Sequence, residues 1–349
     1  MKTKNHIGLM YFIVHFIIEI TCYYIAFSYV NDAQFMILAF LYDMLAFIPE
    51  GFYGMLNDIG LKIHFGYIGM IIAGAALLMF AFDVKPVIAI VTVAIGNGMI
   101  HVQGAQMTLR SSGGKMFPSA LYVAGGSFGV VTGRLLAAGG VPVVPVIIIH
   151  CLMVIPIILA DKQKERVLAG ELADYNYADE KTGRGLVIGI AVFIVILRAY
   201  MGSVVPTSWN DDSVTLILLF SSLGLGKALG GYLIDKIGMR ITVFISTICS
   251  LPFLIFGDKL MVVSLIGLML FSMTMAVALA LGLLVSVMKE YPGLAFGLTT
   301  VGLFFGVFIA AFIKFDDLFV NCVSLAVMTL ISYFALRLIV RKDRKNGSN

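Results

Sequence analysis

Long apolar runs alternate with short polar segments along the whole chain. A helix that spans a bilayer needs about 20 mostly apolar residues, and about twelve runs reach or approach that length. They cover residues 9–30, 34–56, 64–82, 86–108, 117–139, 141–160, 185–206, 213–234, 241–257, 260–287, 293–313 and 318–339. The fifth run is rich in glycine and the ninth is short, so ten or eleven spans are alternatives. The pattern predicts an all-α polytopic membrane protein.

The composition argues against a soluble fold. Of the residues, 60% are apolar and 13% are charged, whereas about a quarter are charged in soluble domains. The only long hydrophilic stretch covers residues 161–184, so no loop can hold a soluble catalytic domain. We therefore predict that the protein is not an enzyme and has no cofactor. The four cysteines lie in predicted spans without metal-ligand spacing, which indicates a packing role.

Basic residues predict the orientation, because cytoplasmic loops of membrane proteins are rich in Lys and Arg. If both termini are cytoplasmic, the outer loops hold only Lys85, Lys259 and Lys314. The inner segments then hold Lys2, Lys4, Lys62, Arg110, Lys115, Lys162, Lys164, Arg166, Lys181, Arg184, Lys236, Arg240, Lys289, Arg337, Arg341, Lys342, Arg344 and Lys345. This asymmetry requires an even number of spans. It also explains the net charge of +4, so we predict a protein of the cell membrane that contacts lipid and binds no nucleic acid.

A short polar motif occurs twice, each time after a long apolar run. One copy reads Gly231-Tyr-Leu-Ile-Asp235-Lys236-Ile-Gly238-Met-Arg240, and the other, degenerate copy reads Gly54-Met-Leu-Asn-Asp58-Ile-Gly60-Leu-Lys62. Asp58 and Asp235 are 177 residues apart in a chain of 349, which indicates two copies of one membrane half. We predict a six-helix bundle over 1–160, a cytoplasmic linker over 161–184, a second six-helix bundle over 185–340, and a basic cytoplasmic tail over 341–349.

The motif has a physical interpretation. Its glycines let the turn lie close to a neighbouring helix. Its carboxylate can contact the positive N-terminal end of another span, while the basic residues bind acidic groups or lipid phosphates. Such a contact would hold the two halves together on the cytoplasmic side. The alternative is a solvated turn.

With this motif, the chain resembles the major facilitator superfamily. The resemblance covers span number, linker position and repeat distance, although here the second-half copy is the better one. After Asp58 the basic residue is missing and one position is deleted. The resemblance implies a secondary transporter that works by alternating access. It implies a gating role for Gly54, Asp58, Gly60, Gly231, Asp235, Lys236, Gly238 and Arg240.

A finer resemblance concerns four of the spans. The residues that carry it are His15-Phe-Ile-Ile-Glu19, Tyr42-Asp43 through Glu50, Gly96-Asn97-Gly98-Met-Ile-His101, and Gly125-Gly126-Ser-Phe-Gly129-Val-Val-Thr-Gly133. This pattern is similar to that of fosmidomycin-resistance-type exporters. Those relatives are proton-coupled drug antiporters, so the resemblance implies proton-coupled efflux.

Ionisable residues inside spans are functional candidates, because a charge at the bilayer centre costs roughly 2.5–3.5 kcal/mol. The repeat equivalent of Glu19 is position 196, two residues from Arg198. The first and seventh predicted spans are equivalent and are expected to face each other across a central cavity, so we expect Glu19 and Arg198 to approach each other there. We expect a pair that breaks or forms as substrate or a proton binds. His15 lies one turn from Glu19 and is a candidate proton relay. The alternatives are a static salt bridge and a histidine satisfied by a neighbouring backbone group.

Glu50 and Lys227 are also repeat equivalents, each eight residues before its motif aspartate. With Asp43 they are candidates for coupling or gating, and structural pairing is the alternative. We expect Arg134 to extend toward the headgroups. We expect His101 and His150 to be hydrogen-bonded interior groups, and we predict no metal site.

Glycines repeat at about four-residue intervals in the fifth and eleventh predicted spans, and a proline opens each span. They are Gly125, Gly129 and Gly133 after Pro118, and Gly293, Gly297, Gly302 and Gly306 after Pro292. Small residues at this spacing let helices approach closely. We expect these two helices to form the interface that moves during alternating access.

Together these features predict a monomeric, proton-coupled exporter of a small organic solute. A proton-coupled symporter for uptake of an organic anion is the alternative, favoured by Arg134, Arg198 and Lys227. A transporter-shaped membrane sensor is an alternative of another class, but the chain has no predicted regulatory domain.

Overall fold

The computed structural model describes residues 3–60, 63–168, 170, 172–273 and 279–342. Lys2, Lys62, Arg344 and Lys345, and the predicted tail from residue 343 on, lie outside these residues. The described part is helical, and its only β-type pairing is one isolated bridge between Ala178 and Val340. The predicted all-α class is confirmed.

The helices of the N-terminal half account for the first six apolar runs. They are α1 (Thr3–Ser28), α2 (Phe35–Phe47), α3 (Glu50–Asp58), α4 (Phe65–Ala81), α5 (Pro86–Ser111), α6 (Phe117–Ala138), α7 (Val143–Leu152) and α8 (Val154–Asp161). Helices α2 and α3 form one span with an interruption at Pro49, which has no N–H to continue the hydrogen-bond ladder. This interruption places Glu50 at the start of α3.

The helices of the C-terminal half follow a short α9 (Lys164–Leu168). They are α10 (Arg184–Val204), α11 (Ser213–Ile237), α12 (Met239–Phe244), α13 (Leu251–Phe256), α14 (Met261–Ser272), α15 (Leu279–Val287), α16 (Pro292–Phe312) and α17 (Leu318–Ile339). A π-helical turn, Ile245–Cys249, joins α12 to α13 within one span just before Pro252. The short ninth run is therefore a complete span that carries a π-bulge.

Ten of the described helical segments are long and apolar enough to cross a membrane. Two shorter apolar helices, α4 and α14, lie where the third and tenth spans were predicted. The tenth run also includes residues 274–278, which lie outside the described part, and α15 follows them. The protein is thus a multi-pass membrane protein with helices at all twelve predicted positions.

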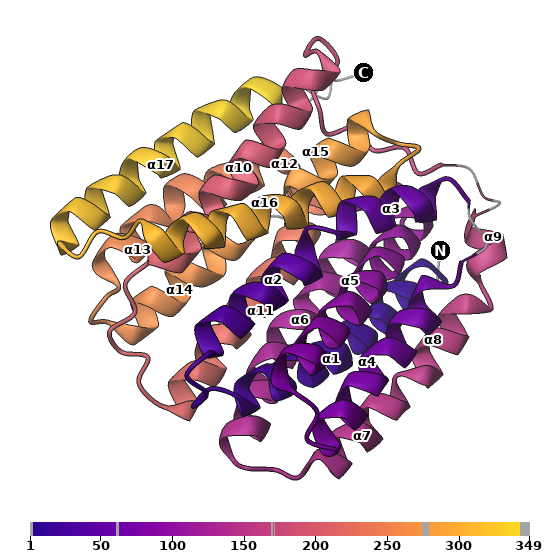
Figure 1. Cartoon of the computed structure of the whole chain (residues 1–349). Helices are drawn as coiled ribbons and strands as arrows, with labels where there is room; N and C mark the ends of the chain where they lie inside the picture. Colours follow the sequence, from indigo (N-terminus) through magenta and orange to yellow (C-terminus); the bar gives the residue numbers. More distant parts are fainter. Residues whose placement is uncertain (1–2, 61–62, 169, 171, 274–278, 343–349) are drawn as a thin grey trace.

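Among the described helices that connect the halves, two pairs approach closely at glycines. Helix α16 lies beside α3 (Figure 1), and an ideal Cβ built on Gly54 would be only 2.3 Å from the carbonyl oxygen of Gly293. Helix α11 packs on α6, where a Cβ on Gly231 would be 2.3 Å from Ala120 Cβ. At these crossings only hydrogen fits.

The glycine repeat of the fifth span has a different role from the expected one. Gly125, Gly129 and Gly133 of α6 pack against the backbone carbonyls of α1, within the same half. In α16, Gly293 and Gly297 face α3 across the halves, whereas Gly302 and Gly306 face α10. The prediction that these glycines form the interface between the halves is therefore wrong for α6. For α16 it is confirmed only for Gly293 and Gly297.

The last part of the linker crosses the end of the bundle that carries Asp58 and Asp235, which we call the motif end. In this strap, residues 174–180, Tyr177 donates a hydrogen bond to the Gly114 carbonyl, and its own N–H donates to Ser286 Oγ. Burial raises the pKa of Tyr177. Hydrogen bonds from Lys289 and Asn176 lower the pKa of Asp174. The strap thus contacts both halves at the motif end.

We predict that Gly54→Ala opens the motif end, because the added methyl group would overlap Gly293. Overpacking of this kind typically costs about 1–3 kcal/mol. Spin labels on cysteines replacing the exposed Ile59 and Glu290 would report the separation of α3 from α16 by pulsed electron paramagnetic resonance. The mean distance should increase relative to the parent protein.

Gly51→Ala is the matched control, because a Cβ at Gly51 meets nothing within 4 Å. It lies in the same helix and should leave the distance distribution unchanged. Equal distributions for Gly54→Ala and the parent would refute the close-packing interpretation.

Candidate functional site

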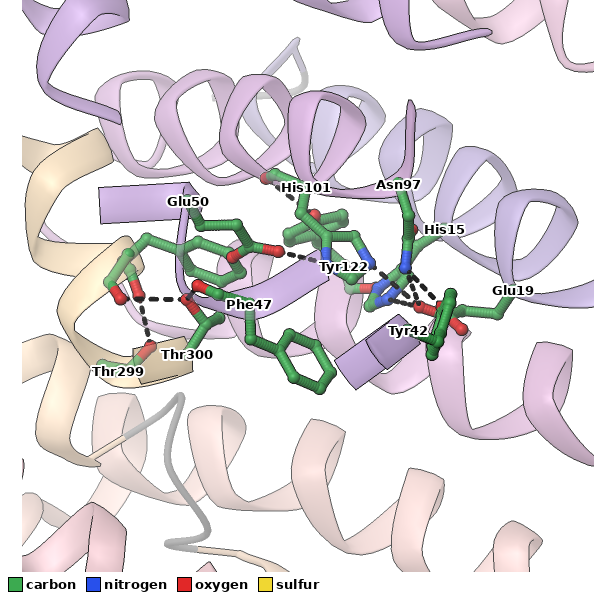
Figure 2. Close-up of polar contacts among 12 residues, drawn as sticks. His15, Glu19, Tyr42, Phe47, Glu50, Asn97, His101, Tyr122, Thr299 and Thr300 are labelled. Carbon is green, nitrogen blue, oxygen red and sulfur yellow. Dashed lines mark hydrogen bonds and ion pairs between the residues drawn. The ribbon is translucent and has the colours of Figure 1, made fainter. Parts of the chain in front are cut away.

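A buried chain of ionisable groups connects α1, α5 and α3. His101 of α5 lies between two carboxylates, with Nε2 3.0 Å from Glu19 Oε1 and Nδ1 2.8 Å from Glu50 Oε1. Figure 2 shows His101 between the two acidic side chains. Glu19 is 5% exposed and Glu50 is fully buried. One imidazole thus contacts two buried carboxyl groups, which would be costly to leave unpaired inside the membrane.

His15 extends this chain by one contact. It lies one turn before Glu19 on α1, and its Nε2 is 3.5 Å from Glu19 Oε1. Its Nδ1 is 3.0 Å from the Tyr122 carbonyl oxygen of α6. Because a carbonyl only accepts, Nδ1 carries the hydrogen and Nε2 is the atom directed toward Glu19. We call His15, Glu19, His101 and Glu50 the His–Glu chain.

Neutral polar side chains surround the His–Glu chain. Asn97 Nδ2 donates to Glu19 Oε1 at 3.3 Å and to the Tyr42 hydroxyl at 2.8 Å. The Tyr122 hydroxyl donates to the His101 carbonyl at 2.8 Å. These bonds hold α1, α2, α5 and α6 in one arrangement around Glu19.

Small residues bring the helices of this site together. A Cβ on Gly98 of α5 would be 2.7 Å from the Ala46 carbonyl oxygen and 3.4 Å from Glu50 Cγ. A Cβ on Gly104 would be 2.7 Å from the Tyr122 ring. The missing side chains let α5 lie against α2, α3 and α6, so that His101 reaches carboxylates on both sides.

The arrangement has a defined proton chemistry. Carboxylate oxygens only accept hydrogen bonds, so each contact of His101 with Glu19 or Glu50 needs one proton between the two atoms. Either His101 is an imidazolium or one carboxyl group is protonated. A proton can therefore move along the chain by small shifts between neighbouring atoms, which is what a coupling site requires.

The same residues can hold a metal ion. The ligand atoms of His15, Glu19 and His101 all lie within 4.8 Å of one another. We predicted no metal site because no ligand spacing was recognised in the sequence, and the third ligand, His101 of α5, joins His15 and Glu19 of α1 only after folding. His101 is a hydrogen-bonded interior group, as expected, and its partners are the carboxyl groups of Glu19 and Glu50.

Arg198 does not meet Glu19. This guanidinium is 1% exposed on α10 and donates through Nη2 to the carbonyl oxygens of Ser246 and Phe271, at 3.3 and 2.6 Å. Its Cζ lies 4.0 Å from the centre of the Phe271 ring. The π-helical turn holds the Ser246 carbonyl that Arg198 binds. The expected pair fails because repeat equivalence gives symmetric positions and does not require contact.

The remaining intramembrane charges also lie apart from each other. Lys227 Nζ of α11 donates to Ser127 Oγ of α6 at 2.9 Å, so it contacts the opposite half but not Glu50. Asp43 of α2 is half-buried and makes no hydrogen bond or ion pair with another described residue.

Arg134 does not simply extend outward, because its Cζ lies 4.4 Å from the Phe27 ring and 5.6 Å from the Phe220 ring. His150 is a hydrogen-bonded interior group, as expected, with Thr21 and the Met70 carbonyl as partners.

The two motif aspartates occupy equivalent positions on opposite halves. Asp58 accepts hydrogen bonds from the N–H groups of Gly293 and Leu294 at the start of α16, at 3.0 and 2.8 Å. Asp235 accepts from those of Met116 and Phe117 at the start of α6, at 2.8 and 2.9 Å. Each carboxylate thus binds the positive end of a helix in the other half.

The other motif residues shape the turns beside these aspartates. Gly60 and Gly238 adopt positive φ angles of 78° and 87°, which favour glycine. Arg240 Nη2 donates to the Val340 carbonyl at 3.2 Å, and Lys236 Nζ lies 5.7 Å from the Tyr232 ring. In the structure Arg240 therefore helps attach the C-terminal end of α17, and neither basic residue pairs with a described carboxylate.

Tyr42 and Asn97 were recognised from the sequence only as part of a family resemblance and not as site residues, and Tyr122 and the strap tyrosines were not singled out. A usable signal was present, because glycines flank Asn97 and a histidine follows one turn later. Glycines next to polar residues in a span indicate close contact with other polar side chains. The tyrosines give no such signal in a chain with 14 of them.

No known protein-family profile and no curated protein sequence matches this chain. Solved structures of transporters nevertheless have a similar fold. FucP, a major facilitator superfamily transporter in the outward conformation, is 12% identical over 94% of this chain and 99% of its own, with a TM-score of 0.57. A bacterial homologue of the iron transporter ferroportin, in an outward-facing state, is 11% identical over 95% of this chain and 98% of its own, with a TM-score of 0.59. The chain therefore has the fold of the major facilitator superfamily.

Proposed function

We propose that the protein is a secondary active transporter that moves a small organic solute by alternating access and is coupled to protons. The buried His–Glu chain is the observation that carries this proposal. Its four ionisable side chains, from α1, α3 and α5, are in contact where charges inside a membrane are costly. The transporter fold shared with both structural neighbours agrees with this function.

The contacts at the motif end support alternating access. Asp58 and Asp235 each bind a helix of the opposite half, and the strap crosses the same end. These bonds must break for the halves to separate there. We propose that the described conformation is closed at the motif end, which we place in the cytoplasm together with both termini.

The position of Glu50 supports coupling between the His–Glu chain and this movement. Glu50 lies at the start of α3, where Gly297 of α16 packs against the backbone of residues 50 and 51. A proton that enters at Glu19 can change the charge at Glu50 through His101. It thereby acts on the contact between α3 and α16, which belongs to the interface that must open.

We propose export from the cell as the direction, following the resemblance to fosmidomycin-resistance-type exporters. Uptake of an organic anion by proton symport is the second candidate, and Lys227 favours it. This lysine reaches across the halves to Ser127, so an anion between the halves would meet its ammonium group. Arg198 gives this alternative less support than expected, because backbone carbonyls surround it. We propose a monomer in the cell membrane for either direction.

We predict that Glu19→Gln abolishes coupled transport, because glutamine keeps the shape but cannot carry the proton. Purified protein would be placed in liposomes with an imposed proton gradient and a pH-sensitive dye inside. Lipophilic drugs and small organic anions would then be added one at a time. Proton movement opposite to an added drug is expected for the parent protein, and only background movement for the variant.

Glu290→Gln is the control, since Glu290 is an exposed carboxylate outside the site, and it should behave as the parent. Proton movement in the same direction as an organic anion would favour the symporter. Undiminished coupled transport by Glu19→Gln would refute the coupling role of the His–Glu chain.

We predict that Asp235→Asn makes the motif end open more often. The carboxylate forms charge-assisted hydrogen bonds worth about 1.5–3 kcal/mol with the N–H groups of Met116 and Phe117, and the neutral amide keeps only part of this. Hydrogen–deuterium exchange of these two amides should accelerate by about tenfold or more.

Asp258→Asn tests the specificity of this effect, because Asp258 is half-buried in a different loop and accepts a hydrogen bond from the Ser208 N–H. It should leave exchange at residues 116 and 117 unchanged. An unchanged rate in Asp235→Asn would show that Asp235 does not hold the motif end closed.

A further inference from the structure

We propose that His15, Glu19 and His101 form a binding site for a divalent transition-metal ion. Two imidazoles and one carboxylate are the donor set typical of Zn²⁺ and similar ions. The proposal concerns binding at this site. It does not depend on which solute the protein transports.

The separations of the ligand atoms agree with this proposal. Ligands about 2.0–2.1 Å from a tetrahedral ion are about 3.3 Å apart. Here Glu19 Oε1 is 3.0 Å from His101 Nε2 and 3.5 Å from His15 Nε2. All three atoms lie within 4.8 Å of one another, so small side-chain rotations complete the geometry.

Neighbouring groups orient both imidazoles for metal binding. Metal-ligating histidines almost always donate their other N–H to a carboxylate or a backbone carbonyl. His15 Nδ1 donates to the Tyr122 carbonyl, and His101 Nδ1 contacts Glu50 Oε1. Both Nε2 atoms are thereby directed to one point beside Glu19. A pair of interior histidines that served only for packing would not need this shared direction.

Charge and a further donor also fit an ion. Gly126 of α6 lets His15 pack against this helix, because a Cβ there would lie 2.5 Å from His15 Nε2 and displace the ring. Asn97 contacts Glu19, and its buried Oδ1 has no hydrogen-bond partner among the described residues. Rotation of this amide would present that oxygen as a further ligand. Glu19 and Glu50 together balance the two charges of the ion, which a buried cation requires.

The direct test is a titration of the full-length protein with Co²⁺, after purification in detergent without a polyhistidine tag and removal of metals with a chelator. Tetrahedral Co²⁺ absorbs in the visible range, so the spectrum reports both binding and geometry. We expect one Co²⁺ per chain, with displacement by Zn²⁺.

Variants separate this site from other histidines. His101→Gln should lower the affinity on the order of 100-fold or more. Glu50→Gln, which keeps all three ligands but changes the group that orients His101 and balances the charge, should lower it about 10–100-fold. Gly126→Ala keeps every ligand but fills the space beside His15, and it should also weaken binding. His150→Gln is the matched control, because His150 is a buried histidine on α7 outside the cluster, and it should bind as the parent does.

Thermal unfolding of each variant without metal would identify the variants that fail to fold. If one of the other variants does not fold, the Co²⁺ affinity of Gly126→Ala tests the proposal in its place. The absence of a saturable Co²⁺ spectrum in the parent protein would overturn the proposal. Equal affinity in the parent, His101→Gln and Gly126→Ala would also overturn it, because the ion would then bind elsewhere.

Discussion

The architecture of the N-terminal half depends on how two buried carboxylates are neutralised. Glu19 and Glu50 lie on different helices, and each would be costly alone inside the membrane. His101 contacts both, with one ring nitrogen directed to each. Glycines let α5 approach closely enough for these contacts, and Tyr122, Asn97 and His15 complete the surrounding hydrogen bonds. A change in the charge of one side chain of the His–Glu chain therefore changes the electrostatic environment of the others.

At the motif end, two carboxylates connect the halves. Asp58 and Asp235 bind the N-terminal ends of α16 and α6, and each bond crosses from one half to the other. Between the His–Glu chain and these bonds lies the tight crossing of α3 with α16, at Gly54 and Gly293. In the mechanism that we propose, the His–Glu chain and the interface between the halves are joined by a single helix, α3, which begins with Glu50 and ends with Asp58.

The sequence allowed the fold class, the span positions and the two motifs to be predicted, because apolar length and a repeated polar turn are local signals. It did not allow the pairing of charges inside the membrane to be predicted. The repeat distance led from Glu19 to Arg198 as its expected partner. In the structure Glu19 contacts His101, and Arg198 donates to backbone carbonyls at a π-helical turn. These contacts depend on helix rotation and on local irregularity, which no residue spacing encodes.

In the mechanism that we propose, the charge state of the His–Glu chain controls whether the motif end is open or closed. The distance between spin labels at positions 59 and 290 can be measured as a function of pH in the parent protein and in His101→Gln. We expect the distribution to shift between a short and a long distance with pH in the parent, and to lose this dependence when His101 is replaced. The same pH-dependent shift in both proteins would contradict the claim.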